Sequence, residues 1–439
     1  MKAHRSSVRK AGLAVAALSV AVSAAFAPAA HAADNGKFRI GIVTFLSGGA
    51  AGPFGVPAAN AAKLVVEALN KGGLPAPYNK KGINGIEIET VIIDENGGAT
   101  KQVEEYRNLV QRQKVDAVIG YISSGDCLAI APVAEELKMP TVFFDCGTSR
   151  LFEAVKSPKY TFRTGLDAVV DNVALARYIV ETRPNIKTVA SIQQNYSFGQ
   201  DSWNDFILTL KHLKPTIKVA SEQWPKLMQG QYGAEISALS VANADLVHSS
   251  FWGGDMEALM LQGSARGLFD KNSVALTCGD TGIEDFKDKI PNGVIIGARG
   301  PYGAFAPKNA LNDWFRPNFT TQFKESPTYP AYKMAQAILG IKAAVEKTAK
   351  PNAMPTADNI TQGLKGLSFE APSGTVKMAS AGGHQAVQGV TYGEYHYDAK
   401  TKKASLTKVK SYAAECLMPP DGTPAVDWIK AGMPGAKCQ

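Results

Sequence analysis

A pair of serines directly after an apolar run is the clearest polar feature that could hold a small molecule. Ser124 is the second of them, it follows the run 115–122, and the next residues have the pattern of a helix. A hydroxyl group and the free backbone N–H groups at the start of a helix suit a carboxylate, helped by the helix dipole. A serine there can equally be a plain helix cap. Asp126 would repel a bound anion if it faced the site, or would only stabilise the helix if it pointed outward.

Residue patterns typical of enzymes are absent from the sequence. There is no G-x-S-x-G nucleophile turn, no H-E-x-x-H metal motif, no phosphate-binding loop and no G-x-G-x-x-G after the first strand-like run. The six histidines are scattered, without the spacing of metal ligands. We therefore predict a protein that is not an enzyme and that has no metal site and no cofactor.

Alternating strand-like and helix-like runs, which begin at Phe38, position these polar residues. Apolar runs such as 115–122 and 188–193 are typical of buried strands, and amphipathic runs such as 100–113 are typical of helices. Near-continuous apolar strands between helices indicate a parallel sheet covered on both faces. Because the alternation comes in two blocks, the sequence predicts two doubly wound α/β lobes, with a ligand beyond the carboxyl ends of the strands. After residue 307 the pattern turns helical, then predicts a β hairpin and an irregular tail.

The first 33 residues have the pattern of a secretory signal peptide. A basic start is followed by the apolar run 11–27 and by Ala30–Ala32, an A-x-A cleavage signature. The apolar run is shorter than the roughly 20 residues of a membrane-spanning helix. We predict a periplasmic protein. Its net charge of +8 includes four basic residues of this leader, and the remaining lysines are mixed with acids, so we expect no nucleic-acid binding.

Six segments, taken in order, resemble the leucine/isoleucine/valine-binding family of periplasmic proteins, which has the type I binding-protein fold. The similarity covers nearly all of residues 37–412, and the order of the segments carries it. They are IGIVTFLSGGAAGPFG at 40–55, DAVIGYISSGDCLAIAPVAEEL at 116–137, PTVFFDCGTSRL at 140–151, FRTGLD at 162–167, SIQQNYSFGQDSWNDF at 191–206 and, more weakly, GTVKMASAGGHQ at 374–385.

The resemblance implies two doubly wound parallel-sheet lobes joined by a three-strand hinge. The expected parts are a signal peptide at 1–33, lobe 1 at 34–163 with 298–374, lobe 2 at 164–297 with 375–412, and a C-terminal tail at 413–439. The implied function is that of an extracytoplasmic solute-binding protein of an ABC transporter. A monomer would capture a small molecule between its lobes and deliver it to a permease in the inner membrane.

On the lobe 1 side, the resemblance implies ligand contacts from four residues. Ser124 and Thr148 offer hydroxyl groups, Cys146 offers its backbone, and Phe54 matches an aromatic residue at the mouth of the cleft. For Thr148 the alternative is that it caps the short helix predicted at 150–155.

On the lobe 2 side, the resemblance implies contacts from four further residues. Tyr196 would close over the ligand, Phe251 and Trp252 would pack on it, and Asp280 would pair with an α-ammonium group. The alternatives are a surface tyrosine, a pair of core aromatic side chains, and a helix cap at Asp280.

Five cysteines in an exported chain allow two disulfides and one free thiol. Cys127 and Cys146 end adjacent strand–loop units, so we predict a disulfide between them. Cys416 and Cys438 are predicted to fasten the tail, which leaves Cys278 free. Arg299 is expected near the second lobe crossing, where it could bind an acidic ligand or brace the hinge.

The sequence supports two hypotheses about the identity of the ligand. Asp280 favours an amine-bearing ligand, hence a branched-chain, aromatic or related amino acid. Phe54, Phe251 and Trp252 favour a bulky or aromatic group, and the family also includes binders of aromatic acids, amides and urea-like molecules. We take the amino acid as the main expectation and the other ligands as the alternative.

Overall fold

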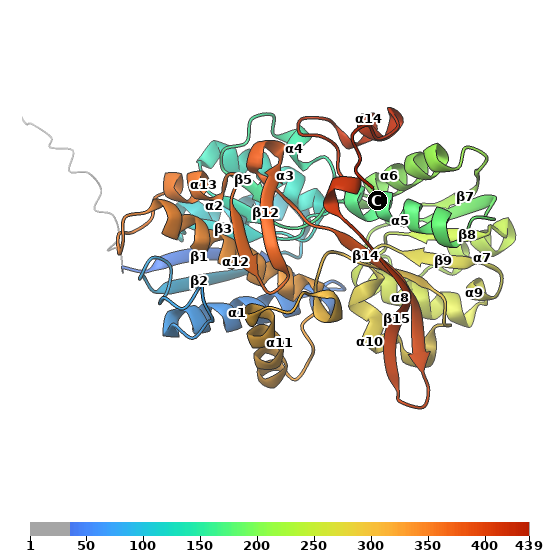
Figure 1. Ribbon diagram of the computed structural model, residues 1–439, viewed down its shortest axis with the longest axis horizontal. Coiled ribbons are helices and arrows are strands. Elements are labelled where there is room, and N and C mark those ends of the chain that lie inside the picture. Colours follow the sequence, from blue (N-terminus) through green and yellow to red (C-terminus); the bar gives the residue numbers. More distant parts are fainter. Residues whose placement is uncertain (1–35, 439) are drawn as a thin grey trace, which may run out of the picture. The chain divides into compact units, whose positions relative to one another are not determined.

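The computed structural model describes residues 36–438, so the predicted signal peptide at 1–33 lies outside the described part. The strands form two sheets (Figure 1). Sheet 1 has the strand order β11-β12-β13-β5-β4-β3-β1-β2. Its strands are β1 (Phe38–Thr44), β2 (Ile88–Asp94), β3 (Ala117–Gly120), β4 (Thr141–Phe143), β5 (Thr161–Arg163), β11 (Ser368–Ala371), β12 (Gly374–Ser380) and β13 (Gln385–Val387).

Sheet 2 is built mainly from the middle of the chain and has the strand order β15-β14-β10-β9-β8-β6-β7. Its strands are β6 (Thr188–Ile192), β7 (Lys218–Gln223), β8 (Leu246–Ser249), β9 (Ser273–Leu276), β10 (Ile295–Ala298), β14 (Val390–Asp398) and β15 (Lys403–Tyr412). In both sheets the central strands are parallel. Toward one edge the pairing is antiparallel: β12 with β11 and β13 in sheet 1, and β14 with β10 and β15 in sheet 2. The predicted α/β class with two doubly wound sheets is confirmed, with these antiparallel edges as an addition.

Helices connect the parallel strands, as a right-handed crossover requires. The longer ones are α1 (Val56–Lys71), α2 (Gly98–Gln111), α3 (Ser124–Leu137), α5 (Ala168–Thr182), α6 (Ser197–Leu213), α7 (Gly233–Ala242), α8 (Gly253–Ala265), α11 (Ala310–Phe323) and α12 (Tyr329–Thr348). The shorter ones are α4 (Leu151–Ala154), α9 (Leu268–Lys271), α10 (Ile283–Phe286), α13 (Ala357–Leu364) and α14 (Ala425–Lys430), with single turns η1 (Ala51–Gly55), η2 (Gly279–Gly282), η3 (Lys287–Lys289), η4 (Gly303–Phe305), η5 (Ala381–Gly383) and η6 (Ala414–Cys416). None of the described helices is both long and apolar enough to span a bilayer.

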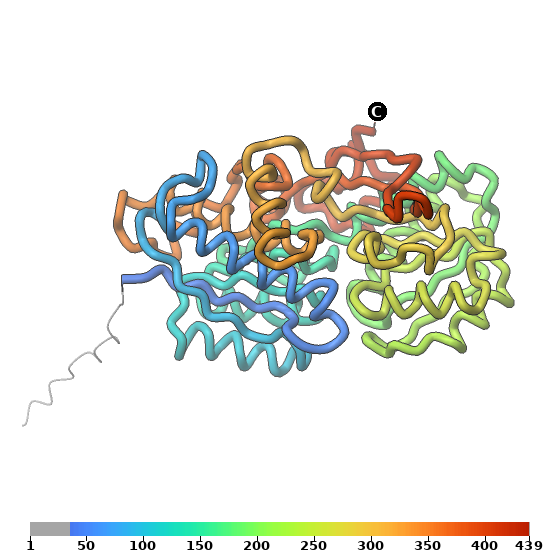
Figure 2. The backbone as a smooth tube through the Cα atoms, turned by 90° about the horizontal axis from the view of Figure 1, so that it is seen from below, coloured from blue at the N-terminus to red at the C-terminus, as the bar shows by residue number. Residues whose placement is uncertain are grey.

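The core of the sheet 1 side is closed by a helix from late in the chain. α12 packs against α1, α13 and β11, and most of its residues are buried. Pro330 lies in its first turn, where the backbone N–H groups have no acceptor within the helix. Because proline has no N–H, it loses no hydrogen bond at this position. Figure 2 shows the orange segment that contains α11 to α13 beside the blue and cyan chain that contains β1 to β4. The core beside sheet 1 therefore combines segments from near the start of the chain with segments from near its end.

Three segments of the chain cross between the sheets, after β5, after β10 and after β13. The sequence analysis assigned residues 375–412 to lobe 2, but β12 and β13 belong to sheet 1, so the third crossing follows Val387. The reason is that β12 pairs antiparallel with β11 and buries Val376 and Met378 in the core of sheet 1. The lobe boundaries otherwise stay a prediction.

The tail after β15 is more ordered than the sequence predicted. α14 packs on α6, and Trp428 and Ile429 are buried with the side chains of α6. The expectation of an irregular tail is therefore wrong at Ala425–Lys430. The predicted hairpin is confirmed as β14 and β15.

Candidate ligand-binding site

A small cavity lies where loops from both sheets meet. The loops after β1, β3 and β4 line it from sheet 1, and the loops after β6, β8, β9 and β10 line it from sheet 2. The lining residues are Phe54, Ile122, Ser124, Asp145, Gly147, Tyr196, Phe198, Trp252, Cys278 and Arg299. All of them follow the carboxyl end of a strand, where open α/β sheets bind ligands.

The cavity is nearly closed in this structure. Its volume is about 10 Å³, room for about one water molecule, whereas sites for small molecules typically span about 300–1,000 Å³. The two sides touch directly, because the backbone N–H of Gly254 donates to the carbonyl of Gly49 at 2.8 Å. A bound metabolite therefore needs the two sides to move apart.

Trp252 is the centre of an aromatic cluster that spans both sides of the cavity. Its ring centroid lies 5.4 Å from that of Phe54 in an edge-on arrangement, and 6.4 Å from that of Tyr196. The indole N–H donates to the Tyr196 hydroxyl at 2.5 Å. Burial raises the pKa of Tyr196 well above its usual value, so the hydroxyl keeps its proton and can donate a hydrogen bond to a ligand.

Gly147 lets the loop after β4 approach this cluster. A Cβ atom at this position would lie 2.4 Å from the ring of Phe198 and 3.1 Å from Nη2 of Arg299. Any side chain there would push the two walls apart, so the close contact requires glycine.

The hydroxyl groups predicted to bind the ligand have partners within the chain. The Ser124 hydroxyl accepts the backbone N–H of Thr148 at 3.1 Å. The Thr148 hydroxyl donates to Asp201 of α6 at 2.5 Å, and Asp201 also pairs with Arg150 at 2.7 Å. Ser124 lines the cavity, but Thr148 does not. Thr148 instead joins the loop after β4 to α6.

A buried glutamate lies under the start of α3. Both carboxylate oxygens of Glu95 accept the N–H of Ile122, at 2.9 and 3.0 Å, and one accepts the N–H of Ser123 at 2.7 Å. Burial, and then repulsion from Asp126, raises the pKa of Glu95 well above its usual value. Burial raises the pKa of Asp126 to about 6. Glu95 takes up the N–H groups that directly precede α3, and the two acids together reduce the positive potential there that the sequence analysis assigned to a ligand carboxylate.

Arg299 braces the two sides of the cavity. Its Nη1 donates to Asp145 after β4 at 2.9 Å, and its Nε donates to Asp171 of α5 at 2.9 Å. Tyr329 of α12 donates to the same Asp145 oxygen at 2.8 Å. Burial opposes the charge of Arg299, but Asp171, Tyr329 and Asp145 hold its pKa well above its usual value. Of the two roles left open by the sequence, the geometry favours the brace.

Asp280 is a buried carboxyl group without a regular hydrogen bond. It is 5% exposed, and neither oxygen has a partner of acceptable geometry among the described residues. The Tyr302 hydroxyl faces the carboxyl group but does not complete such a bond. Burial raises the pKa of Asp280 to about 7, opposed by Tyr302 and Arg299. Asp280 follows Cys278, which lines the cavity.

Comparisons with known proteins agree with this geometry. Residues 37–401 match the family described as periplasmic binding protein. The chain belongs to that family. A search of curated proteins returned no significant match.

Solved structures show the same fold for this periplasmic binding protein. An ABC-transporter solute-binding protein from Rhodopseudomonas palustris BisB5, in complex with 3,4-dihydroxybenzoic acid, is 21% identical with a TM-score of 0.73 and covers 86% of this chain and 98% of its own. A benzoate complex from R. palustris is 19% identical with a TM-score of 0.71, covering 85% and 96%. A leucine-binding protein from Thermotoga maritima is 18% identical with a TM-score of 0.69, covering 84% and 98%.

Four of the eight residues expected at the site line the cavity of this periplasmic binding protein, namely Phe54, Ser124, Tyr196 and Trp252. The other four do not. Phe251 packs edge-on against Tyr232, 4.9 Å away, in the core of the sheet 2 side. Cys146 forms a disulfide, and Thr148 and Asp280 have the surroundings described above.

Both expected disulfides are present, Cys127–Cys146 and Cys416–Cys438, and Cys278 is the free cysteine. The first links the first turn of α3 to the loop after β4, two of the segments that form the cavity wall. The carbonyls of Cys146 and Thr148 also accept hydrogen bonds from Arg163, at 2.7 and 2.6 Å. The loop after β4 is therefore fixed to α3 by the disulfide and to β5, just before the first crossing, by the hydrogen bonds of Arg163.

The sequence analysis missed several lining residues of this periplasmic binding protein. Phe198 lies two residues after Tyr196 in the same loop, and both side chains line the cavity, but the sequence analysis named Tyr196 alone. Asp145 and Gly147 lie in the segment after β4, and their neighbours Cys146 and Thr148 were chosen. Position after a strand identified the right loops, but it did not say which side chains point inward.

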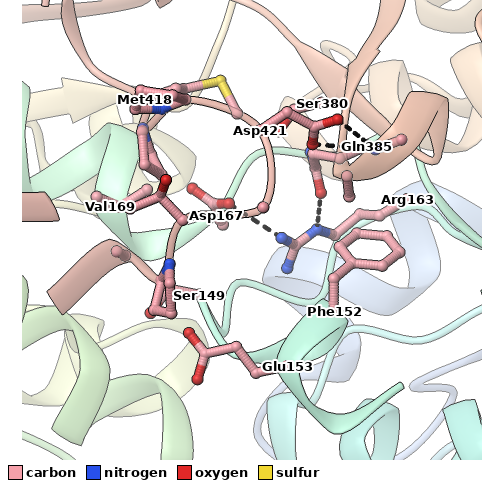
Figure 3. Close-up of a pocket in the computed structure, with 18 of the residues that line it drawn as sticks. Ser149, Phe152, Glu153, Arg163, Asp167, Val169, Ser380, Gln385, Met418 and Asp421 are labelled. Carbon is pink, nitrogen blue, oxygen red and sulfur yellow. Dashed lines mark hydrogen bonds and ion pairs between the residues drawn. The ribbon is translucent and has the colours of Figure 1, made fainter. Parts of the chain in front are cut away.

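A second cavity, of about 400 Å³, lies beside the first crossing (Figure 3). Arg163 donates to Asp167 at 3.0 Å and to Gln385 at 2.5 Å on one side of it. The tail from Met418 to Ala425 forms the other side. Arg163 connects this cavity to the loop after β4, because it also binds the carbonyls of that loop.

Proposed function

We propose that this protein is the capture component of an ABC importer, which binds an amino acid in the cavity between its sheets and delivers it to a permease in the inner membrane. The expected location is the periplasm, after removal of the signal peptide. The family match and the ABC-transporter proteins of the same fold support the transport role.

The observation that carries the proposal is the cavity itself. Residues from both sheets line it, and contacts such as Gly254 to Gly49 join its two sides directly. The three crossings leave the sides connected by few segments, so opening and closing about those segments would admit and enclose a ligand. Aromatic side chains supply much buried area for a small molecule at little cost in side-chain entropy.

A second candidate is the same role for an aromatic acid. Two of the solved structures with this fold contain benzoate and 3,4-dihydroxybenzoic acid. The rings of Phe54, Phe198 and Trp252 would suit a flat aromatic ligand. Arg299 is the one basic residue among those that line the cavity, and two carboxylates already hold it.

The test is to purify the protein from its own periplasm without denaturing it, unfold it, and identify the released small molecule by mass spectrometry. A thermal-shift screen of amino acids and aromatic acids follows on refolded protein. We expect an amino acid in both experiments, with micromolar or tighter binding, which corresponds to roughly 8 kcal/mol. The absence of any released molecule and of any stabilising compound would contradict the proposal.

A further inference from the structure

We propose that two acids on α6 form a proton-dependent latch, so that closing the two sides of the cavity takes up a proton at Asp205. The latch lies outside the ligand cavity. It goes beyond the proposed function, because it holds for any ligand that the closed cavity encloses. Three features support it: contacts across the interface, a buried acid without a partner, and the charges around that acid.

Asp201 joins α6 to the loop after β4. One of its carboxylate oxygens accepts the Thr148 hydroxyl at 2.5 Å, and the other pairs with Nε of Arg150 at 2.7 Å. Asp201 belongs to the sheet 2 side, whereas Thr148 and Arg150 belong to the sheet 1 side. Both contacts must therefore break when the two sides move apart.

Asp205 lies one helical turn after Asp201 at the same interface. Residues four apart share a face of a helix, and the Ser149 hydroxyl of the loop after β4 faces the Asp205 carboxyl group without completing a regular hydrogen bond. The side chain is 0% exposed, and neither oxygen has a hydrogen-bond partner among the described residues. Burying an ionised carboxylate in such a place costs much more than burying a protonated one. The closed interface therefore favours the neutral form of Asp205.

The acids around Asp205 strengthen this preference. Burial raises the pKa of Asp205 well above its usual value, and repulsion from Asp201, Asp167 and Glu153 adds to the rise. Glu153 and Asp167 both line the second cavity, on the wall that also contains Ser149 (Figure 3). Acids from α4, from the start of α5 and from α6 itself thus converge on this carboxyl group.

The cations that pair with these acids are engaged with groups other than Asp205. Arg150 pairs with Asp201, and Arg163 pairs with Asp167 at 3.0 Å. Neither ion pair supplies a counter-ion to Asp205, so a proton is the simplest way to neutralise it.

The other elements that pack on α6 do not change this balance. On α5, Asp171 is bound by Arg299, and on α14, Asp427 adds a further acid beside α4. On α3, the Asp126 carboxyl group faces the serine that caps the helix. On β8, His248 stacks on a phenylalanine of α6, and burial lowers its pKa to about 3, so it is uncharged. The basic residues at the ends of α4, α6 and α14 are exposed, where solvent screens them: Lys156, Lys211, His212 and Lys430.

The sign of the pH dependence follows from this geometry. When the sides move apart, the loop after β4 no longer covers α6, and the pKa of Asp205 falls toward its ordinary 3.8. The closed form therefore holds a proton that the open form releases. Between the two pKa values, each rise of one pH unit lowers the equilibrium constant for closing by up to about tenfold. Above the higher value the constant stays level, so acid favours the closed form.

The first test measures closure without a ligand. Small-angle X-ray scattering of refolded, ligand-free protein gives the radius of gyration, which is larger when the sides are apart. We expect the wild type to be more compact at about pH 5 than at about pH 8. Asp205→Asn stays neutral, so at the higher pH it should be as compact as the wild type is at the lower one. The same pH response in both proteins, or none in the wild type, would overturn the inference.

Two further variants complete this test. Asp427→Asn removes an exposed acid of the neighbouring α14 and is the control, which should keep the wild-type response. Thr148→Val keeps the shape of the side chain and removes the hydroxyl that binds Asp201. We expect it to be less compact than the wild type at the lower pH, and an unchanged radius of gyration would contradict the latch. Thermal unfolding checks that each variant folds, and Thr148→Val leaves Asp205 itself intact.

The second test counts protons during binding, with leucine as the probe. Calorimetry at about pH 6.5 in two buffers of different ionisation enthalpy gives the number of protons taken up per leucine bound. We expect the wild type to take up to about one proton more than Asp205→Asn. Leucine binding with equal proton uptake in both proteins would overturn the latch and leave the proposed function intact. A pH response in scattering without any binding of leucine would support the latch and count against leucine as the ligand.

Discussion

Replacing Asp280 by asparagine separates a ligand-binding role for this carboxyl group from a structural one. The side chain is 5% exposed, and burial raises its pKa from the ordinary 3.8 to about 7. At a pH above both values, the folded protein holds a charge that burial disfavours by about three pKa units, or roughly 4 kcal/mol. Asparagine has nearly the same shape and no charge, so it removes this unfavourable contribution.

The pH dependence of this effect has a definite sign. Between pH 3.8 and about 7, the folded protein keeps a proton that the unfolded chain has released. Stability of the wild type therefore falls as the pH rises through this window, and then stays level. Without ligand, Asp280→Asn should show little difference from the wild type near pH 4. At pH 8 its free energy of unfolding should be higher by up to about 4 kcal/mol.

Urea unfolding at several pH values measures this difference, and calorimetry with an amino acid measures binding. The same variant should bind an amino acid more weakly by orders of magnitude, because the ammonium group would be buried without its counter-ion. Asp288→Asn, on the exposed turn η3, is the control and should change neither quantity. A variant less stable than the wild type at pH 8, with unchanged affinity, would show that Asp280 only supports its turn, and the reasoning would be refuted.

Three further changes probe the frame of the site. Serine at both Cys416 and Cys438 should lower the free energy of unfolding by about 3 kcal/mol, the loop-closure value for a bridge of this span, and equal urea midpoints would contradict it. Arg299→Met should destabilise the protein by about 3–5 kcal/mol, because two buried aspartates lose their cation, and a smaller loss in thermal unfolding would argue against the brace. Tyr196→Phe should weaken ligand binding about tenfold, because it removes a donor and the acceptor of the Trp252 indole, and unchanged calorimetric affinity would remove Tyr196 from the site.

The sequence predicted the sheets well where apolar runs were long enough to bury on both faces. Val115–Ile122 contains β3, and the hairpin at the end of the chain is β14 and β15. β12 and β13 were placed in the wrong lobe, because neither the alternating buried and exposed residues of β12 nor the three residues of β13 reveal which sheet these strands join. α14 was missed because six residues are too few to show a helical period.

The sequence predicted the loops of the candidate site better than its side chains. Position after a strand identified the segments of Ser124, Tyr196 and Trp252. It could not show that the Thr148 hydroxyl reaches Asp201, because that contact depends on how the two sides close on one another. Glu95 was missed for a similar reason, since a glutamate in a polar turn gives no sign that it lies buried under another loop.

The arrangement of the cysteines provides a chemical reporter of opening. Four of them are bonded in pairs, and Cys278 is free, 1% exposed and part of the cavity wall. Burial raises the pKa of its thiol, so a thiol reagent meets an unreactive, covered group while the two sides touch. The rate of alkylation would then follow the fraction of time that the cavity stands open. One natural residue thus allows the opening kinetics to be timed with no label introduced by mutation.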